Sequence, residues 1–269
     1  MLETIKETIS FINSRTKIRP EIGIILGTGL GGMVKEIDIA DTLEYEDIPN
    51  FPVSTVESHH GKLIFGTLGG KRIVAMQGRF HYYEGYSLQE ITFPVRVMKY
   101  LGISHLFVSN ASGGINPNQE IGDLMILDDH ISLIPNPLIG KHEPEFGDRF
   151  PDMSETYDKA LIERALEIGK KNNYPVCQGC YVGVTGPTLE TPKEYQYFRI
   201  IGGDAVGMST VPEIIVAHQM GITCFAISII TDLGVPGKIV KVSLHDVTSV
   251  AGKAEPRMTH IMKELIGGL

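Results

Sequence analysis

The residues best suited to chemistry lie in the stretch 77–85, which reads Gln-Gly-Arg-Phe-His-Tyr-Tyr-Glu-Gly and follows a predicted strand. It places a permanent cation, Arg79, close to the imidazole of His81 and the phenols of Tyr82 and Tyr83. A guanidinium group offers a planar fork of donors for phosphate or carboxylate, and imidazole titrates near neutral pH. A tyrosine can hydrogen-bond a sugar hydroxyl while its ring packs against the sugar. The pattern favours a binding site, although a surface loop with Arg79 in an ordinary salt bridge has the same residues.

Small or polar residues follow several other predicted strands. In α/β proteins the carboxyl ends of strands line the ligand crevice. Any one of these segments is equally consistent with a plain turn or a helix cap. Their number is what indicates a single crevice beyond the sheet. The segments are 27–32, 109–114, 184–190, 205–210 and the pair Thr231 and Asp232.

The segment 27–32 formally matches the dinucleotide fingerprint G-x-G-x-x-G after a strand. That motif requires a helix, then a second strand ending in an acid about 20 residues further on. The following residues include Pro49 and Pro52 and show no clean helix or strand, so we reject a nicotinamide site. The exposed backbone N–H groups of the turn and the hydroxyl of Thr28 still suit an anion.

The elements that must position these residues alternate between strands and helices. Helical spacing predicts a helix over 2–15, and a buried apolar run predicts a strand over 22–26. Gly69 and Gly70 join two strands in an antiparallel hairpin, so the sheet is mixed. We therefore expect one domain over 1–269 that forms a three-layer αβα sandwich with a mixed, twisted central sheet. Further strands are predicted at 63–68, 72–76, 105–109, 124–127, 178–184 and 222–230, and a long loop at 135–152.

Four helix starts carry a capping box, in which a hydroxyl group and a carboxylate three residues later satisfy free backbone donors. The pairs are Ser87 with Glu90, Thr191 with Glu194, Thr210 with Glu213, and Ser243 with Asp246.

Composition limits the classes of partner. The 269 residues are 42% hydrophobic and 21% charged, with a net charge of −8, which disfavours nucleic acid and acidic membranes. No apolar run approaches the roughly 20 residues of a membrane span, and no export signal is visible, so we expect a cytoplasmic protein.

The three cysteines do not form a metal or redox site in this interpretation. A zinc site needs a second pair beside Cys177 and Cys180, and only Cys224 remains.

Taken together, the motifs resemble those of the trimeric purine nucleoside phosphorylases, the relatives of methylthioadenosine phosphorylase. The resemblance runs from about residue 20 to the C-terminus, and the order and spacing of its segments make it specific. The matching segments are 27–32, 77–81, 110–114, 147–151, Gly186 and Pro187 with Glu190, and 207–213.

The resemblance implies the nucleoside phosphorylase fold and cleavage of purine nucleosides by inorganic phosphate to the free base and ribose 1-phosphate. Phosphate is a co-substrate, and no metal or organic cofactor is expected. The resemblance implies phosphate ligands at Thr28, His59, Arg79, His81, the backbone of Ala111, and Ser209. It implies nucleoside contacts at Tyr83, His81, Met208 and His245 for the sugar, and at Ala111, Tyr181, Leu189, Glu190, Val206 and Asp232 for the base.

Four of these residues, His81, Glu190, Asp232 and His245, are expected to act in catalysis. Phe150 is expected to reach into the site of a neighbouring subunit, which implies a homotrimer.

Two positions depart from the pattern of the phosphorylases that act on 6-oxopurines, which normally carry Asn at 232 and Ser at 28. Asp232 and Thr28 are typical of methylthioadenosine phosphorylases. An ionised Asp232 accepts hydrogen bonds and suits a 6-amino group, whereas a protonated one donates to N7 or O6. Glu190 suits the N1–H of a 6-oxopurine, and His245 favours a 5′-hydroxyl over a methylthio group. Base preference therefore stays open. Leu189, where Phe is common, removes some stacking on the base.

Three hypotheses follow from the sequence. The first is purine nucleoside phosphorolysis in purine salvage. The second is 5′-methylthioadenosine phosphorolysis, and the third is a non-catalytic nucleoside-binding protein that kept the fold. A phosphate-dependent release of base separates the first two from the third.

Overall fold

The computed structural model describes residues 1–53 and 61–269, and its strands form one mixed nine-stranded sheet. The strand order is β2-β3-β4-β1-β5-β8-β7-β6-β9. Because β5 also pairs with β9, the strands from β5 to β9 close on themselves beside the open part of the sheet. The strands are β1 (Ile22–Leu26), β2 (Asp38–Glu44), β3 (Lys62–Leu68), β4 (Lys71–Gln77), β5 (His105–Gly114), β6 (Leu124–Ser132), β7 (Val176–Gly183), β8 (Ala205–Gly207) and β9 (Thr223–Leu233).

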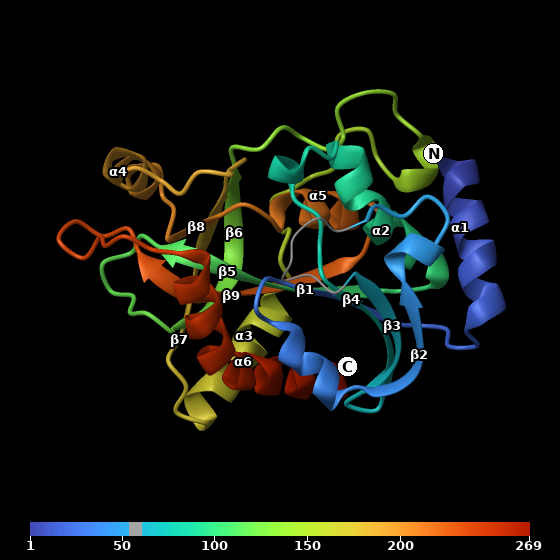
Figure 1. The fold of residues 1–269 in the computed structure, drawn as a ribbon, viewed down its shortest axis with the longest axis horizontal. Helices are drawn as coiled ribbons and strands as arrows, with labels where there is room; N and C mark the ends of the chain where they lie inside the picture. The colour runs from blue at the N-terminus through green and yellow to red at the C-terminus, as the bar shows by residue number, and fades with distance from the viewer. Residues whose placement is uncertain (54–60) are drawn as a thin grey trace.

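Helices cover the sheet from both sides (Figure 1). Helices α1 (Leu2–Arg15), α2 (Leu88–Leu101) and α5 (Val211–Gln219) pack together on one side, and α3 (Lys159–Lys171) packs on α6 (Leu244–Gly267) on the other. Helix α4 (Pro192–Ile200) lies at the margin of the molecule. This confirms the predicted mixed α/β architecture. The described ranges also contain four 3-10 turns: η1 (Gly31–Glu36), η2 (Tyr45–Asp47), η3 (Tyr82–Glu84) and η4 (Pro144–Phe146).

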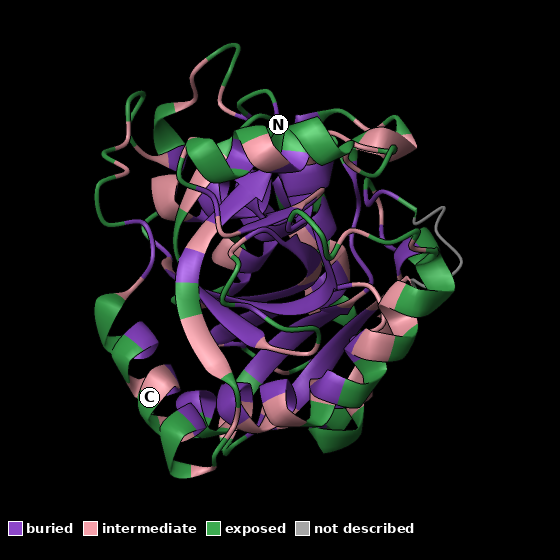
Figure 2. Cartoon of the chain, turned by 90° about the vertical axis from the view of Figure 1, so that its left-hand side faces the viewer, coloured by how far each residue is buried: buried purple, intermediate pink, exposed green. Residues whose placement is uncertain are grey.

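The centre of the core is the parallel group formed by β1, β4 and β5. All residues of β1 are buried, as its continuous apolar sequence predicts for a strand covered on both faces. Figure 2 shows the strands buried at the centre and the exposed surface on the outer faces of the helices. Because these three strands run in the same direction, the residues that follow them gather at one edge of the sheet.

The hairpin of β3 and β4 is confirmed, and Gly69 and Gly70 have φ of 58° and 80° in its two-residue turn. The prediction that no strand follows the glycine-rich turn is wrong, because β2 forms there. It is an edge strand with no buried residue, so it lacks the apolar alternation that marks a strand in sequence. The prediction that the strand at 105–109 ends there is also wrong, because β5 continues to Gly114. Pairing with both β8 and β9 holds these small residues in a strand.

Three of the four predicted capping boxes are confirmed, at the starts of α2, α4 and α6. The box predicted for Thr210 and Glu213 is wrong. Thr210 makes no side-chain cap hydrogen bond in the described part of the chain, and Glu213 instead pairs with Arg79. The region 135–152 is irregular apart from η4, as predicted.

Within the described ranges, no helix combines the length and the apolarity that crossing a membrane requires.

Candidate active site

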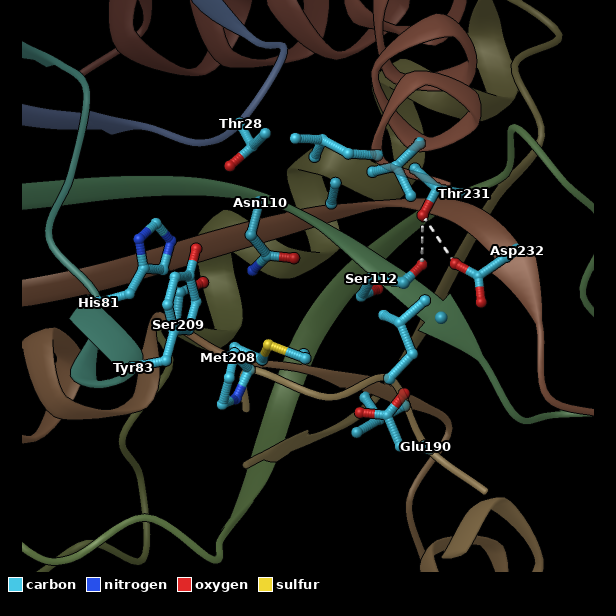
Figure 3. Close-up of a pocket in the computed structure, with 18 of the residues that line it drawn as sticks. Thr28, His81, Tyr83, Asn110, Ser112, Glu190, Met208, Ser209, Thr231 and Asp232 are labelled. Atoms are coloured by element: carbon cyan, nitrogen blue, oxygen red, sulfur yellow. Dashed lines mark hydrogen bonds between the residues drawn. The ribbon is translucent and has the colours of Figure 1, made fainter. Parts of the chain in front are cut away.

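A cavity of about 420 Å3 lies where the carboxyl ends of β1, β4, β8 and β9 meet the second half of β5 (Figure 3). This volume falls in the usual range of about 300–1,000 Å3 for small-molecule sites. The lining residues come from segments far apart in sequence, and most follow a strand end. They are Thr28, Arg79, His81, Tyr83, Asn110, Ala111, Ser112, Gly113, Pro187, Leu189, Glu190, Val206, Gly207, Met208, Ser209, Thr231, Asp232, Ser243, Leu244 and Val247.

Arg79 sits at one end of the cavity and is only 1% exposed. Its Nη1 donates to the backbone oxygen of Ser109 at 2.9 Å and to Oγ of Ser209 at 3.1 Å. Its Nη2 lies 3.2 Å from Oε1 of Glu213, whose side chain is 3% exposed. A buried charge requires such a partner, and these contacts fix the guanidinium plane beside the cavity.

A chain of buried hydrogen bonds joins Ser209 to the middle of the sheet. The Oγ atoms of Ser209 and Thr210 lie 3.2 Å apart, and Nδ2 of Asn110 donates to Thr210 Oγ1 at 2.9 Å. Ser228 Oγ donates to Oδ1 of Asn110 at 2.5 Å and lies 2.5 Å from Oγ of Ser112. The sequence offered no role for Ser112, and the structure places it at the end of this network. A fully bonded network of this kind rigidifies the residues that it holds.

Thr210 has φ 71° and ψ −54°, a backbone conformation that a β-branched residue rarely adopts. Such a residue costs about 1–3 kcal/mol and persists only where its surroundings impose it. Here the backbone N–H of Ser209 donates to the hydroxyl of Tyr181 at 3.4 Å, and Asn110 holds the Thr210 side chain. The strain therefore fixes the direction of Ser209 at the cavity wall.

His81 is positioned by Glu84 in the short turn that follows β4. Glu84 Oε1 accepts the backbone N–H of His81 at 2.8 Å and lies 2.9 Å from its Nδ1. Nδ1 donates in this arrangement, which sets the ring tautomer. The ring of Tyr83 stacks on His81 with centroids 4.8 Å apart. Burial raises the pKa of Tyr83 to about 12, so its hydroxyl keeps its proton at neutral pH.

At the other end of the cavity, a β-bulge orients Asp232. Ser112 pairs with Ile230 and Gly113 with Asp232, so Thr231 is the extra residue on β9. Thr231 Oγ1 lies 3.2 Å from the carbonyl oxygen of Ser112 and 3.0 Å from Oδ1 of Asp232 (Figure 3). Asp232 is 8% exposed, and burial raises its pKa, partly opposed by hydrogen bonds from Thr231 and Tyr195.

Glu190 is the second carboxyl group at this end and is half-buried. Burial raises its pKa, and the negative charge of Asp232 raises it further. The lining also includes the apolar side chains of Leu189, Val206 and Met208. One end of the cavity thus offers fixed donors, and the other offers two titratable groups in an apolar wall. This arrangement suits an anion joined to a flat polar ring.

Comparisons with known proteins agree with this geometry. The family model described as the phosphorylase superfamily matches residues 21–267. Purine nucleoside phosphorylase 1 of Bacillus subtilis (strain 168) is 48% identical over 267 residues, covering 99% of this chain and 98% of the relative. The chain belongs to the phosphorylase superfamily, among its purine nucleoside phosphorylases.

Solved structures of the same family superpose closely on this fold. Isoform 2 of purine nucleoside phosphorylase from Schistosoma mansoni, in complex with cytosine and ribose-1-phosphate, has a TM-score of 0.95 at 41% identity, covering 99% of this chain and 96% of that one. Schistosoma mansoni purine nucleoside phosphorylase in complex with adenosine has a TM-score of 0.94 at 41% identity, covering 99% and 97%. The recognised family and the predicted fold are both confirmed.

Most residues that the phosphorylase resemblance singled out line the one cavity. They are Thr28, Arg79, His81, Tyr83, Ala111, Leu189, Glu190, Val206, Met208, Ser209 and Asp232. Their individual roles remain predictions.

Three described residues singled out by the resemblance are placed elsewhere. Tyr181 is fully buried beneath Ser209 and, within the described residues, supports the wall without lining it. His245 is exposed in the first turn of α6, next to the lining residue Leu244. Phe150 is 87% exposed and does not line its own chain's cavity as described. His59 lies outside the described residues.

Several residues of this site were not identified from the sequence. Asn110 belonged to a segment singled out for its small residues and for the family resemblance, with no role given to its own side chain, and Ser228 lies inside an apolar strand. Glu213 was assigned to a helix cap. Only Ser228 left a local signal, a polar side chain in an otherwise apolar run of a predicted strand.

Proposed function

We propose that this chain catalyses the reversible phosphorolysis of purine ribonucleosides and 2′-deoxyribonucleosides, giving the free base and the pentose 1-phosphate, in purine salvage. The observation that carries the proposal is a cavity with a buried arginine, held by Ser109, Ser209 and Glu213, at one end and two carboxyl groups at the other. A phosphate requires donors such as those at the arginine end, and a purine suits the carboxyl end, with the pentose between them.

We assign the arginine end to inorganic phosphate. Arg79 and Ser209 supply donors whose directions are fixed by Glu213 and the buried network. Thr28 in the glycine-rich turn, His81 and the backbone of Ala111 complete this end. His59 belongs to the same proposal by family resemblance and lies outside the described residues.

The pentose is assigned to the middle of the cavity, against Tyr83, His81 and Met208. These side chains combine an aromatic face, a thioether and polar atoms, which suits a sugar. His245 is assigned to the 5′-hydroxyl. Its exposed position at the start of α6 requires that this turn approach the bound sugar.

We place the purine between the apolar residues and the two carboxyl groups. Val206 and Leu189 contact its faces, with Ala111 beside them and Tyr181 supporting the wall from behind. Glu190 and Asp232 face its polar edge. This pairing of an apolar wall with a few polar groups is how flat ligands without charge are bound.

In the reaction, the bond between the pentose and the purine breaks, and its electron pair leaves with the base. Positive charge develops on the sugar, where the phosphate dianion stabilises it and then attacks C1′. Negative charge develops on the purine, where a neutral Asp232 donates a hydrogen bond or a proton. Only stabilisation that is specific to this moment accelerates the step.

We also propose how the chain assembles and where in the cell it acts. Phe150 projects 87% exposed from the loop after η4, so it is available to a second copy, and we propose a homotrimer in which it completes the neighbouring site. Phosphate is the co-substrate, and no other cofactor is proposed. The chain acts as one domain over 1–269 in the cytoplasm. A Phe150→Ala variant with raised KM for nucleoside, in a chain whose trimer persists by light scattering, tests this assignment.

The deciding experiment measures base release from inosine, guanosine, adenosine and 5′-methylthioadenosine with and without phosphate. We expect turnover of at least one purine nucleoside that depends strictly on phosphate and yields a pentose 1-phosphate. A clear preference for 5′-methylthioadenosine would replace this proposal by the related activity. Binding without turnover would show a nucleoside-binding protein.

A further inference from the structure

Tyr195 occupies a position in α4 that places it beside Glu190. The capping box of Thr191 and Glu194 opens the helix, so Glu190 is the residue before the cap and Tyr195 is the fourth residue of the helix. In such a start, the side chains at these two positions pack against each other, usually as two apolar groups. Here the pair consists of a carboxyl group and a phenol.

The same phenol reaches the end of β9. A side chain at Gly234 would collide with the ring of Tyr195, so the ring lies directly on the backbone that follows β9. Its hydroxyl group donates to Oδ2 of Asp232 at 3.5 Å, and both residues are buried. Tyr195 is therefore placed between the two carboxyl groups and behind the lining of the cavity.

Hydrogen counting constrains the charge of this group. The Tyr195 hydroxyl carries one hydrogen, and so does that of Thr231, which lies 3.2 Å from the Ser112 carbonyl oxygen, an acceptor only. If Glu190 and Asp232 were both ionised, the single Tyr195 hydrogen could serve only one of them, and the phenol oxygen would face the other carboxylate with no hydrogen between them. With one proton on either carboxyl group, Tyr195 can donate to one of them and accept from the other.

Electrostatics supports the same count. Burial raises the pKa of Asp232, and the groups that lower it in part are Thr231 on β9 and Tyr195 on α4. Burial also raises the pKa of Glu190, partly opposed by hydrogen bonds from its own backbone N–H and from Tyr195, and the charges of Asp232 and Glu194 raise it further. The charge of Asp232 thus disfavours the ionised form of Glu190, and burial disfavours the ionised form of both groups.

We propose that Tyr195 is a positioning residue that joins Glu190 and Asp232 into one pair holding a single proton, and that this pair accepts both 6-oxo- and 6-aminopurine nucleosides. The inference rests on the proposed function. A 6-oxopurine offers a donor at N1 and an acceptor at O6, whereas a 6-aminopurine offers the reverse. With the proton on Asp232 the pair matches the first base, and with the proton on Glu190 it matches the second.

The two arrangements interconvert through the Tyr195 hydroxyl group. Asp232 gives its proton to the phenol oxygen, and the phenol hydrogen passes to Glu190, so no net charge is created. The substrate therefore decides where the proton lies, and the total charge of the site stays the same.

The test compares kcat/KM for inosine and adenosine, with phosphate saturating, between pH 6 and pH 8 in the full chain and in Tyr195→Phe. Phenylalanine keeps the ring on Gly234 and removes only the hydroxyl group. In the unchanged chain, we expect both substrates to react and their ratio to vary little with pH. In Tyr195→Phe we expect the ratio to change at least about fivefold, the effect of one lost hydrogen bond, and to become dependent on pH.

Tyr197→Phe is the matched control, because Tyr197 lies on the same helix and is 52% exposed. It should leave the ratio and its pH profile unchanged. In an Asp232→Asn background, Tyr195→Phe should have no further effect on the ratio, since the pair no longer exists. Comparing Asp232→Asn with the double variant also shows whether Tyr195→Phe acts by disturbing the fold, because the two proteins differ only at residue 195.

Distinct outcomes overturn the inference and the proposed function. If the unchanged chain cleaves only one of the two nucleosides, or if Tyr195→Phe leaves the ratio and its pH profile as they were, the shared proton is wrong and phosphorolysis stands. If no purine nucleoside is cleaved with phosphate, the proposed function and the inference fall together.

Discussion

The two ends of the cavity differ in how their charge is set. At the arginine end, Arg79 and Glu213 are 1% and 3% exposed and face each other at 3.2 Å, so both charges are fixed by pairing. At the base end, Glu190 and Asp232 have raised pKa values, and burial is the main cause for each. The first end thus presents a cation whose direction is fixed by its partners. The second end can change its hydrogen-bonding pattern by moving a proton, which permits more than one base.

Removing the fixed charge should have the largest effect. Arg79→Ala should lower kcat/KM for phosphate by about 10²–10³-fold, as the loss of a donor to a developing or bound oxyanion typically does. The dissociation constant for nucleoside, measured by calorimetry without phosphate, should change far less. Equal losses for both ligands would remove the distinction between the two ends.

Arg79→Ala also leaves the Glu213 carboxylate buried without its cation, which destabilises a fold by about 3–5 kcal/mol. The double variant Arg79→Ala with Glu213→Gln is the matched control. It should recover most of the unfolding free energy in urea denaturation while phosphate use stays low. Recovery of activity in the double variant would show that Arg79→Ala acted through stability.

At the base end, Asp232→Asn should raise the ratio of inosine to adenosine turnover by about tenfold, the effect of one hydrogen bond to a charged or polar partner. An amide always carries donor hydrogens, so it favours O6 and N7 at every pH. Parallel kcat/KM measurements on the two nucleosides give the ratio. An unchanged ratio would remove Asp232 from base selection.

Variants of Glu255 test how far phosphate binding at the arginine end depends on the support of the glycine-rich turn. Its Oε1 accepts the backbone N–H groups of Gly32 and Met33 at 2.6 and 3.2 Å, which ties the glycine-rich turn to α6. Glu255→Ala should raise KM for phosphate about three- to tenfold, because Thr28 loses part of its support. Glu255→Gln should restore most of this loss. Glu264 is exposed and lines the same surface groove as Glu255, so Glu264→Ala should leave the KM for phosphate unchanged.

The smallest expected effect is on stability. The folded-state pKa of Asp232 is raised above its unfolded value, so its contribution to stability is present at low pH and is lost as pH rises through the folded pKa. Asp232→Asn removes this dependence. We expect the variant to melt a few degrees above the unchanged protein at pH 7, with the difference vanishing near about pH 4, the ordinary pKa of aspartate. A lower melting temperature for the variant than for the unchanged protein at pH 7 would contradict the explanation that burial raises the pKa of Asp232.

The sequence predicted the strand-end segments of the site because their signals are local. Apolar runs that end in glycine, serine or threonine pointed to Thr28, Arg79, Ser209 and Asp232, and one edge of the sheet brings them together. The family resemblance added the functional order of these segments. It also singled out Tyr181, which the structure places behind the wall.

What the sequence could not predict depends on partners that are distant along the chain. The bulge at Thr231 exists only in the register of β9 against β5, and Tyr195 meets Asp232 only after α4 packs on the end of β9. Glu213 fits a helix cap by spacing, and its true partner Arg79 comes from another strand end. Long-range register and burial decide such cases, and neither leaves a local pattern.

The pairing of Arg79 with Glu213 has a consequence for how phosphate reaches the protein. The cation is neutralised at short range, and the chain as a whole carries a net charge of −8, so no long-range field draws an oxyanion inward. Screening by dissolved ions acts mainly on such long-range fields. Dissolved ions instead screen the repulsion between this net negative charge and phosphate, so phosphate capture should not weaken as ionic strength rises. Chloride, which lacks the tetrahedral set of acceptors, should compete poorly even when it is abundant.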